Sequence, residues 1–280
     1  MKNVIAFLCF AFGGAQVLWA QETFVPRNKI KLQIDFEMVA DAQRTQFVYS
    51  LSNETGAEQN VWQFRLYLTR QIEILEQGKP SGWIGSYSTD GRQARAFWAC
   101  PSRGKHIQPG KSASGFYLNA NYPPGVVAFY AEGYGPIPEG EADSIPGYDD
   151  LTPYGPGVVG KTVGPVLPPD PFVAADFVDT LASYKHQAAA LGWVGQEGFL
   201  KQLDEKLDQA RDQLAKGHTK QARDKVDEFL KKIEHEAKKT EKDQDKKNDK
   251  KWVTSEGYAL LKFNAEYLTE KLDGLIRKKK

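Results

Sequence analysis

The sequence contains very few cysteines, only two among 280 residues. Cys9 lies in the first apolar segment and Cys100 lies far from it along the chain. If that first segment is removed, Cys100 is the one cysteine left, and a disulfide within the chain is excluded. Cys100 is then expected to be a small, half-buried strand residue, with a bridge between two chains as the alternative. The folded parts must be held together by apolar cores.

The sequence also lacks a large excess of charge of one sign. It has 37 Lys+Arg against 36 Asp+Glu, which gives a formal net charge of +1. We therefore expect no nucleic-acid partner, since proteins that bind nucleic acids carry strongly basic surfaces. Acidic residues prevail up to Leu200 and basic residues prevail from Lys201 onward. The two halves can attract each other at low salt, although exposed ion pairs are weak and screened.

Long apolar runs are missing except at the amino terminus, where Val4 to Trp19 follows Lys2 and ends at Ala20. This order of a charged, an apolar and a small residue is typical of a secretory signal peptide over residues 1–20, with cleavage after Ala20. A membrane anchor is the alternative, but the run is short for a span and contains two glycines. We therefore predict a secreted protein that acts outside the cytoplasm and has no transmembrane anchor.

Residues 26–135 show the alternation of apolar and polar residues expected for strands with one buried face. The apolar members include Ile30, Leu32, Ile34, Phe36, Met38, Phe47, Tyr49, Leu51, Trp62, Phe64, Leu66 and Leu68. Turn sequences such as TDG at 89–91 and PGK at 109–111 separate shorter apolar stretches. Roughly seven or eight short strands without helical patterns predict an all-β antiparallel sandwich of immunoglobulin-like type.

Residues 136–170 are dense in proline and glycine and show no periodicity, so we predict an extended linker. The segment includes a formal match to a nucleotide-binding loop, from Gly155 to Thr162. Such a loop needs a strand before it and a helix after it, and the prolines that follow exclude that helix. Five acidic residues between 139 and 150 offer oxygen ligands for calcium, but a solvated linker is the simpler interpretation.

Residues 171–280 change to the three-and-four spacing of amphipathic helices. We expect a helix that starts with a carboxylate cap at Asp170 and Pro171, then two helices separated at Gly217, and a last helix capped by Thr254. Gly192 is expected to end the first of these helices. Four such stripes predict an antiparallel bundle.

The helical half resembles the FIMAH domain of secreted bacterial proteins over residues 191–272. The positions that carry the resemblance are Gly192, Trp193, Leu203, Leu207, Ala210, Leu214, Gly217, Ala222, Phe229, Leu230, Leu260 and Leu261. The strand half, with the segments FVYSLSNETGAEQNVWQFRLYL and YPPGVVAFYAEG, is similar to the sandwich that often precedes this module. The resemblance implies a fold but no reaction and no ligand. The charged insertion at 236–251 departs from the family pattern.

The sequence offers no constellation of catalytic residues. The four histidines lie far apart and have no cysteine partners, which disfavours a zinc site, and no cofactor is expected. The leading hypothesis is therefore a non-enzymatic protein with a structural or protein-binding role, whose partner is another protein or a cell-surface or matrix component. The alternative is glycan binding by exposed sandwich aromatics, for which Trp83, Tyr87 and Tyr122 are the candidates. A hydrolase whose acidic residues meet only in the folded chain is the third possibility.

Overall fold

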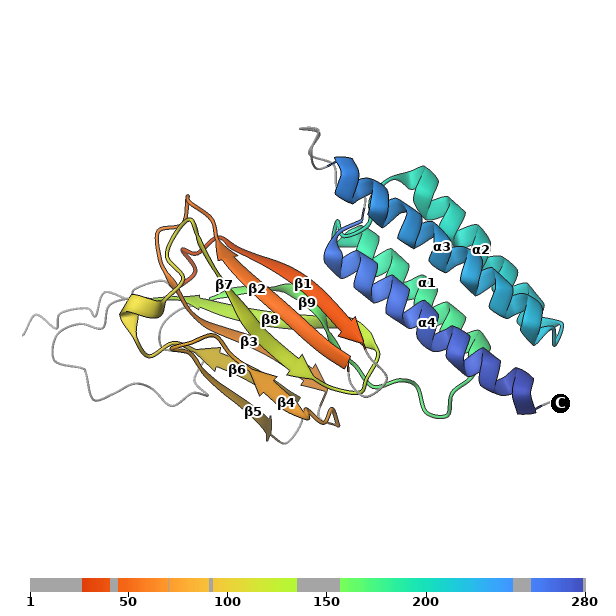
Figure 1. The fold of residues 1–280 in the computed structure, drawn as a ribbon, viewed down its shortest axis with the longest axis horizontal. Helices are drawn as coiled ribbons and strands as arrows, with labels where there is room; N and C mark the ends of the chain where they lie inside the picture. The colour runs from red at the N-terminus through yellow and green to blue at the C-terminus, as the bar shows by residue number, and fades with distance from the viewer. Residues whose placement is uncertain are drawn as a thin grey trace, which may run out of the picture.

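The computed structural model describes residues 27–40, 45–69, 71–90, 93–134, 157–243 and 253–278, without the side chains of residues 90 and 240–243. The strands are β1 Leu32–Ala40, β2 Thr45–Asn53, β3 Val61–Thr69, β4 Glu76–Gly78, β5 Ile84–Asp90, β6 Gln93–Ala99, β7 Lys111–Asn119, β8 Pro124–Gly133 and β9 Val158–Pro165. The helices are the short 3-10 helix η1 Arg103–Lys105, then α1 Ala174–Ala190, α2 Glu197–Ala215, α3 Thr219–Asp243 and α4 Ser255–Lys278. Figure 1 shows the strands in one half of the molecule and the long helices in the other.

The strands form two antiparallel sheets. One has the order β1-β2-β7-β4 and the other the order β5-β6-β3-β8-β9. Their facing sides carry the alternating residues predicted from the sequence, and Phe47, Tyr49 and Phe64 are fully buried. The Phe64 and Trp98 rings stack with centroids 5.5 Å apart at an interplanar angle of 19°. The prediction of an antiparallel sandwich followed by a helical bundle is thus confirmed.

Strand β9 corrects the predicted linker. Residues 158–165 pair with β8 along their whole length and complete the five-stranded sheet. The Tyr49 hydroxyl in the other sheet donates a hydrogen bond of 2.9 Å to the Val163 carbonyl oxygen. Glycine in this strand marks close packing, because a Cβ on Gly160 would lie 2.5 Å from the Phe129 ring. The acidic stretch and the expected signal peptide lie outside the described residues.

The four helices pack as an antiparallel bundle in which α1 contacts both α2 and α4, and α3 contacts both α2 and α4. Gly192 and Gly217 have positive φ angles of 73° and 76°, which confirms their role at helix ends. The Thr254 hydroxyl accepts a hydrogen bond of 3.3 Å from the Gly257 amide, which is the cap predicted for the last helix. Within the described chain, no helix is sufficiently long and apolar to cross a membrane.

The start of the first helix differs from the prediction. Helix α1 begins at Ala174, and its N-cap is Val173, which makes no side-chain hydrogen bond to the helix. Asp170 is therefore too far upstream to cap the free amides. Helix α3 runs to Asp243 and so continues into the charged insertion, whose remaining residues lie outside the described chain.

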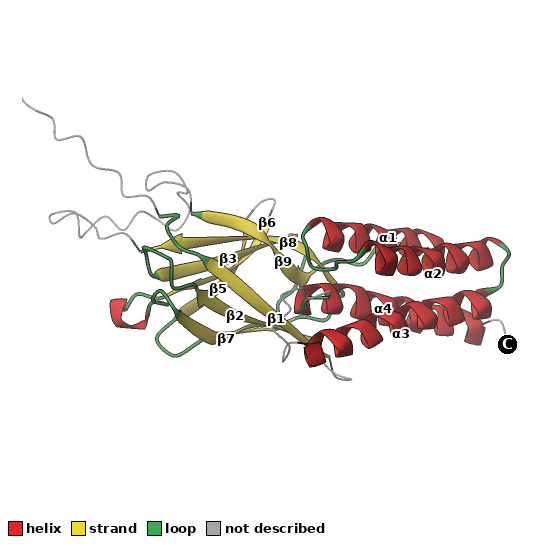
Figure 2. Cartoon of the chain, turned by 90° about the horizontal axis from the view of Figure 1, so that it is seen from above, coloured by secondary structure: helices red, strands yellow, loops and turns green. Residues whose placement is uncertain are grey.

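Helix α4 joins the bundle to the sandwich and contacts β1, β8 and β9. The buried Asn264 amide donates hydrogen bonds of 2.8 Å to the Pro124 carbonyl oxygen and 2.7 Å to the Leu260 carbonyl oxygen. At the start of α4, the Ser255 hydroxyl accepts a bond of 3.4 Å from the Phe36 amide. Figure 2 shows the bundle beyond one end of the two sheets, so the outer face of the five-stranded sheet stays clear of the helices.

Candidate functional site

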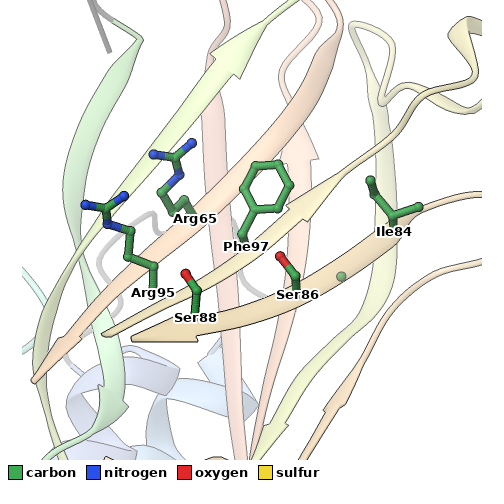
Figure 3. Close-up of a pocket in the computed structure, with 7 residues that line it drawn as sticks. Arg65, Ile84, Ser86, Ser88, Arg95 and Phe97 are labelled. Carbon is green, nitrogen blue, oxygen red and sulfur yellow. The ribbon is translucent and has the colours of Figure 1, made fainter. Parts of the chain in front are cut away.

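A groove lies on the outer face of the five-stranded sheet, on the side away from the aromatic core. Its volume is about 270 Å³, and the residues around it come from β3, β5 and β6. In Figure 3, arginine, serine and phenylalanine side chains project from the same face of these strands. The lining residues are Arg65, Ile84, Gly85, Ser86, Ser88, Arg95 and Phe97. The lining side chains thus include two arginines, two serines and one phenylalanine.

Strand pairing explains why residues from distant parts of the chain meet here. Strand β6 pairs with β5 on one side and with β3 on the other. Ser88 lies opposite Arg95, while Phe97 lies between Ser86 on one side and Arg65 on the other. Side chains alternate between the two faces of a strand, so these five residues share the outer face and their immediate neighbours point into the core.

Arg65 is held between two aromatic rings. Its guanidinium carbon lies 5.3 Å from the centroid of the Phe97 ring and 5.8 Å from that of the Tyr130 ring. The residue is only 4 % exposed. Ring faces attract a cation, and the attraction of a cation to an anion grows where water is displaced. Arg65 thus places a positive charge at the floor of the groove.

A second polar chain continues along the same face away from the groove. The Tyr130 hydroxyl donates a hydrogen bond of 2.8 Å to one Glu132 oxygen, and the other oxygen accepts a bond of 2.8 Å from Arg27. The Arg27 guanidinium lies 5.6 Å from the centroid of the Trp62 ring. Burial, followed by the interaction with Glu132, raises the pKa of Tyr130 well above its ordinary value. The phenol therefore stays protonated, and the Glu132 charge is compensated by Arg27.

The chemistry of the groove suits binding. Arginine and serine side chains bring hydrogen-bond donors to the groove beside the ring of Phe97. Ser86 and Ser88 add hydroxyls at the rim. Among the lining residues, neither serine has a histidine or carboxylate beside it.

Trp83 does not take part in any exposed aromatic surface, and its predicted exposure is wrong. The residue is 3 % exposed, and its ring packs edge-on against Phe116 with centroids 4.9 Å apart. The Trp83 amide donates to the Pro80 carbonyl oxygen at 3.1 Å in the turn before β5. That turn directs the indole into the space between the sheets.

Tyr87 and Tyr122 are half-buried, and their hydroxyls bond to one short stretch of backbone. Tyr87 donates to the Ile72 carbonyl oxygen. Tyr122 donates to the Gln71 carbonyl oxygen at 3.4 Å and accepts from the Glu73 amide at 3.3 Å. Both tyrosines therefore anchor the connection between β3 and β4, and a role for them in ligand binding stays a prediction.

The other motifs do not converge on a second site. Among the residues that the structure describes, no three His, Cys, Asp or Glu side chains are grouped to hold a metal ion. His106 is buried, with Nε2 3.0 Å from the Cys100 carbonyl oxygen. Cys100 is itself buried, 1 % exposed, just after β6. Lys161 and Thr162 belong to strand β9, which confirms that the glycine-rich match does not open a helix.

Sequence reasoning missed the residues of the groove. Its strands are predicted by their alternation, and the TDG turn between Ser88 and Arg95 indicates a hairpin. The residues of that hairpin that face outward can be predicted from the sequence, because they alternate with the buried residues. The position of Arg65 beside Phe97 cannot be predicted from the sequence, because it depends on which strand pairs with β6.

The molecule is thus a β-sandwich joined to an antiparallel helical bundle. The family model of the FIMAH domain matches residues 178–248. This match confirms the resemblance of the helical half, although the matched range starts earlier than residue 191 and ends before α4. The bundle therefore contains a FIMAH domain built from most of α1, all of α2 and all of α3.

Two solved structures are similar to this chain. One is an uncharacterized protein from Nocardia farcinica with an immunoglobulin-like fold, at 9 % identity and a TM-score of 0.29, covering 48 % of this chain and 98 % of that one. The other is a non-cellulosomal cohesin from the hyperthermophilic archaeon Archaeoglobus fulgidus, at 15 % identity and a TM-score of 0.25, covering 36 % and 77 %. No curated protein matches the sequence.

Proposed function

We propose that this chain is a secreted, non-enzymatic protein that binds another protein outside the cytoplasm through the outer face of its five-stranded sheet. The observation that carries the proposal is the groove, which combines two arginines with two hydroxyls and an aromatic ring beside a sheet edge. Such a surface can orient a partner, and its lining residues include no general base. The apolar run that ends at Ala20 supports export.

Glycan binding and hydrolysis receive less support. The indole of Trp83 is buried, and the hydroxyls of Tyr87 and Tyr122 are engaged with the protein's own backbone. No flat, exposed aromatic platform for a sugar ring results from these three residues. For hydrolysis, neither groove serine has a base within the lining set.

Two experiments test the proposal. The full chain is expressed in a bacterial host, and the mature protein is expected outside the cytoplasm with Gln21 as its first residue; an uncleaved, cytoplasmic chain would contradict export. The mature protein is then used to select from a displayed library of random peptides. We expect enriched peptides that bind the wild type and fail to bind Ser86→Trp, which fills the groove from an exposed strand position. No enrichment, or equal binding to both proteins, would refute binding of proteins at this face.

A further inference from the structure

The edge strands of the two sheets differ in how far they are kept from pairing with another chain. Sheet edges are usually protected by a cover, by charged residues or by being short. At β1 the Phe36 amide donates to the Ser255 hydroxyl of α4, and at β9 the Tyr49 hydroxyl donates to the Val163 carbonyl oxygen. Strand β4 has only three residues. Strand β5 has seven and, in the described part of the chain, pairs with β6 alone.

The residues of β5 do not discourage edge pairing either. From Ile84 to Thr89 the strand has no charged residue and no proline, and Gly85, Ser86, Ser88 and Thr89 are exposed. Figure 1 shows β5 at the lower border of the molecule, on the side away from the helices. An edge strand of this kind presents its backbone N–H and C=O groups to another strand.

The hydrogen-bond pattern identifies the residues of β5 whose backbone faces this edge. The Cys100 amide donates to the Trp62 carbonyl oxygen at 2.8 Å, in register with the pairing of β6 and β3. Backbone groups alternate between the two sides of a strand, so the odd-numbered residues of β6 face β5. These residues lie opposite the even-numbered residues of β5. The backbone N–H and C=O groups of Gly85, Tyr87 and Thr89 therefore point away from β6.

The three outward residues are spaced symmetrically about Tyr87, so the strand matches a second copy of itself. When the two strands lie antiparallel with both Tyr87 residues at a two-fold axis, Gly85 of one copy lies opposite Thr89 of the other. Each outward N–H then meets an outward C=O of the other copy. Ser86 lies opposite Ser88 of the other copy, and no like charges meet between Ile84 and Thr89.

The side chains at this border also fit a second copy. A facing pair of serines already occurs within the sandwich, where the Ser52 and Ser112 hydroxyls lie 2.7 Å apart on β2 and β7. Leu75, which leads into β4, is 54 % exposed, and Ile84 is 39 % exposed. Strand β4 contacts β5, so both residues belong to the same border of the sandwich. Contact with another chain there removes apolar surface from water.

We propose that two copies of this chain associate through β5 and join their five-stranded sheets into one continuous antiparallel sheet. The two-fold axis is perpendicular to this sheet, so the outer faces of both copies, with their grooves, lie on the same side. Binding of a partner at that face then becomes bivalent, which raises the overall affinity without a new contact. The association needs no other partner, so its test is independent of the proposed function.

Sedimentation equilibrium of the mature protein measures the association, and we expect a reversible dimer whose share rises with concentration. In the double variants Ser86→Lys/Ser88→Lys and Ser86→Glu/Ser88→Glu, like charges lie opposite each other across the axis. The dissociation constant is expected to rise by about tenfold or more in each. Mixing the two variants places opposite charges together and is expected to restore the dimer.

A matched control adds the same charge elsewhere. Ser114 on β7 of the other sheet and Ser183 on α1 are exposed, and Ser114→Lys/Ser183→Lys is expected to leave the association unchanged. The circular dichroism spectrum of each variant is compared with that of the wild type to confirm that the fold is retained.

Amide hydrogen exchange of the wild type, followed by nuclear magnetic resonance, tests the geometry without any substitution. At low concentration we expect slow exchange at the amides of Ser86 and Ser88 and fast exchange at those of Gly85, Tyr87 and Thr89. Raising the concentration is expected to slow exchange at these last three amides. A protein that stays monomeric at every soluble concentration, a dimer that both charged variants retain, or new protection on another strand instead of β5 would each overturn the inference.

Discussion

Two glycines in helix α4 provide a test of the packing, because the same substitution should act in opposite directions. Gly257 lies in the first turn of α4, and a Cβ placed there would lie 2.5 Å from the Trp193 carbonyl oxygen and 2.9 Å from a Val194 methyl carbon. That carbonyl accepts a hydrogen bond of 2.8 Å from the Thr254 amide. At Gly274, further along the same helix, nothing lies within 4 Å of the added carbon.

The magnitudes follow from these distances. Alanine at 257 forces the backbone of Trp193 to move, which costs about 1–3 kcal/mol for overpacking, together with about 1 kcal/mol for the weakened hydrogen bond. The better helix propensity of alanine returns roughly 1 kcal/mol. Gly257→Ala should therefore lower the free energy of unfolding by about 1–3 kcal/mol. Gly274→Ala gains only the propensity and should raise the free energy of unfolding by about 0.5–1 kcal/mol.

The assay is urea unfolding of the purified protein followed by far-ultraviolet circular dichroism, which reports mainly on the helices. We expect the midpoint of the helical transition to fall for Gly257→Ala and to rise for Gly274→Ala, with the slope against urea unchanged in both. A wild-type midpoint for Gly257→Ala, or a lower midpoint for both variants, would refute the assigned contact between the Trp193 carbonyl and the start of α4.

Three other substitutions test separate contacts. Lys185 is 1 % exposed and pairs with Asp204, so Asp204→Asn should leave a buried ammonium ion uncompensated and lower the free energy of unfolding by about 1–3 kcal/mol. Adding Lys185→Met should recover the lost stability. A wild-type melting curve for Asp204→Asn alone would contradict this assignment. Burial lowers the pKa of His106, so its contribution to the free energy of unfolding should be constant above about pH 6.5 and should fall as the pH drops below that value toward the lower folded-state pKa. Chemical unfolding across this pH range should therefore give a flatter dependence of stability on pH for His106→Gln. Asn264→Ala removes the bond to the Pro124 carbonyl oxygen, and limited proteolysis should cleave between sandwich and bundle faster than in the wild type; an unchanged rate would mean that other contacts hold the two halves.

The sequence predicts most of the elements because their apolar residues repeat with a clear period. The alternation through Phe47, Tyr49 and Leu51 is enough to predict β2. Strand β9 is not predicted, because its glycines resemble turn residues, whereas Gly160 is needed for the close approach of the Phe129 ring. Local sequence does not reveal which partner occupies the space next to a glycine.

The groove escapes prediction for a different reason. Arg95 and Phe97 lie two residues apart on β6, but only the pairing of β3 with β6 places Arg65 opposite Phe97. The exposure of Trp83 cannot be decided from the sequence either, since the side chain of a turn residue can point inward or outward. In the structure, the turn closed by the Pro80 carbonyl oxygen directs it inward. Period and turn signals specify elements, but a binding surface depends on how the elements pair.

The position of β9 in the chain affects how the sandwich can be cut or synthesised. The strand is the last of the sheet, and it leads within a few residues into α1. A polypeptide that stopped at residue 135 would leave β8 paired with β3 alone and would uncover Phe129. The exposed backbone edge of β8 would then favour self-association. During synthesis, the five-stranded sheet therefore cannot be completed until residue 165 has been made. A proteolytic cut that separates the two halves and keeps β9 in its sheet must fall between Pro165 and Ala174.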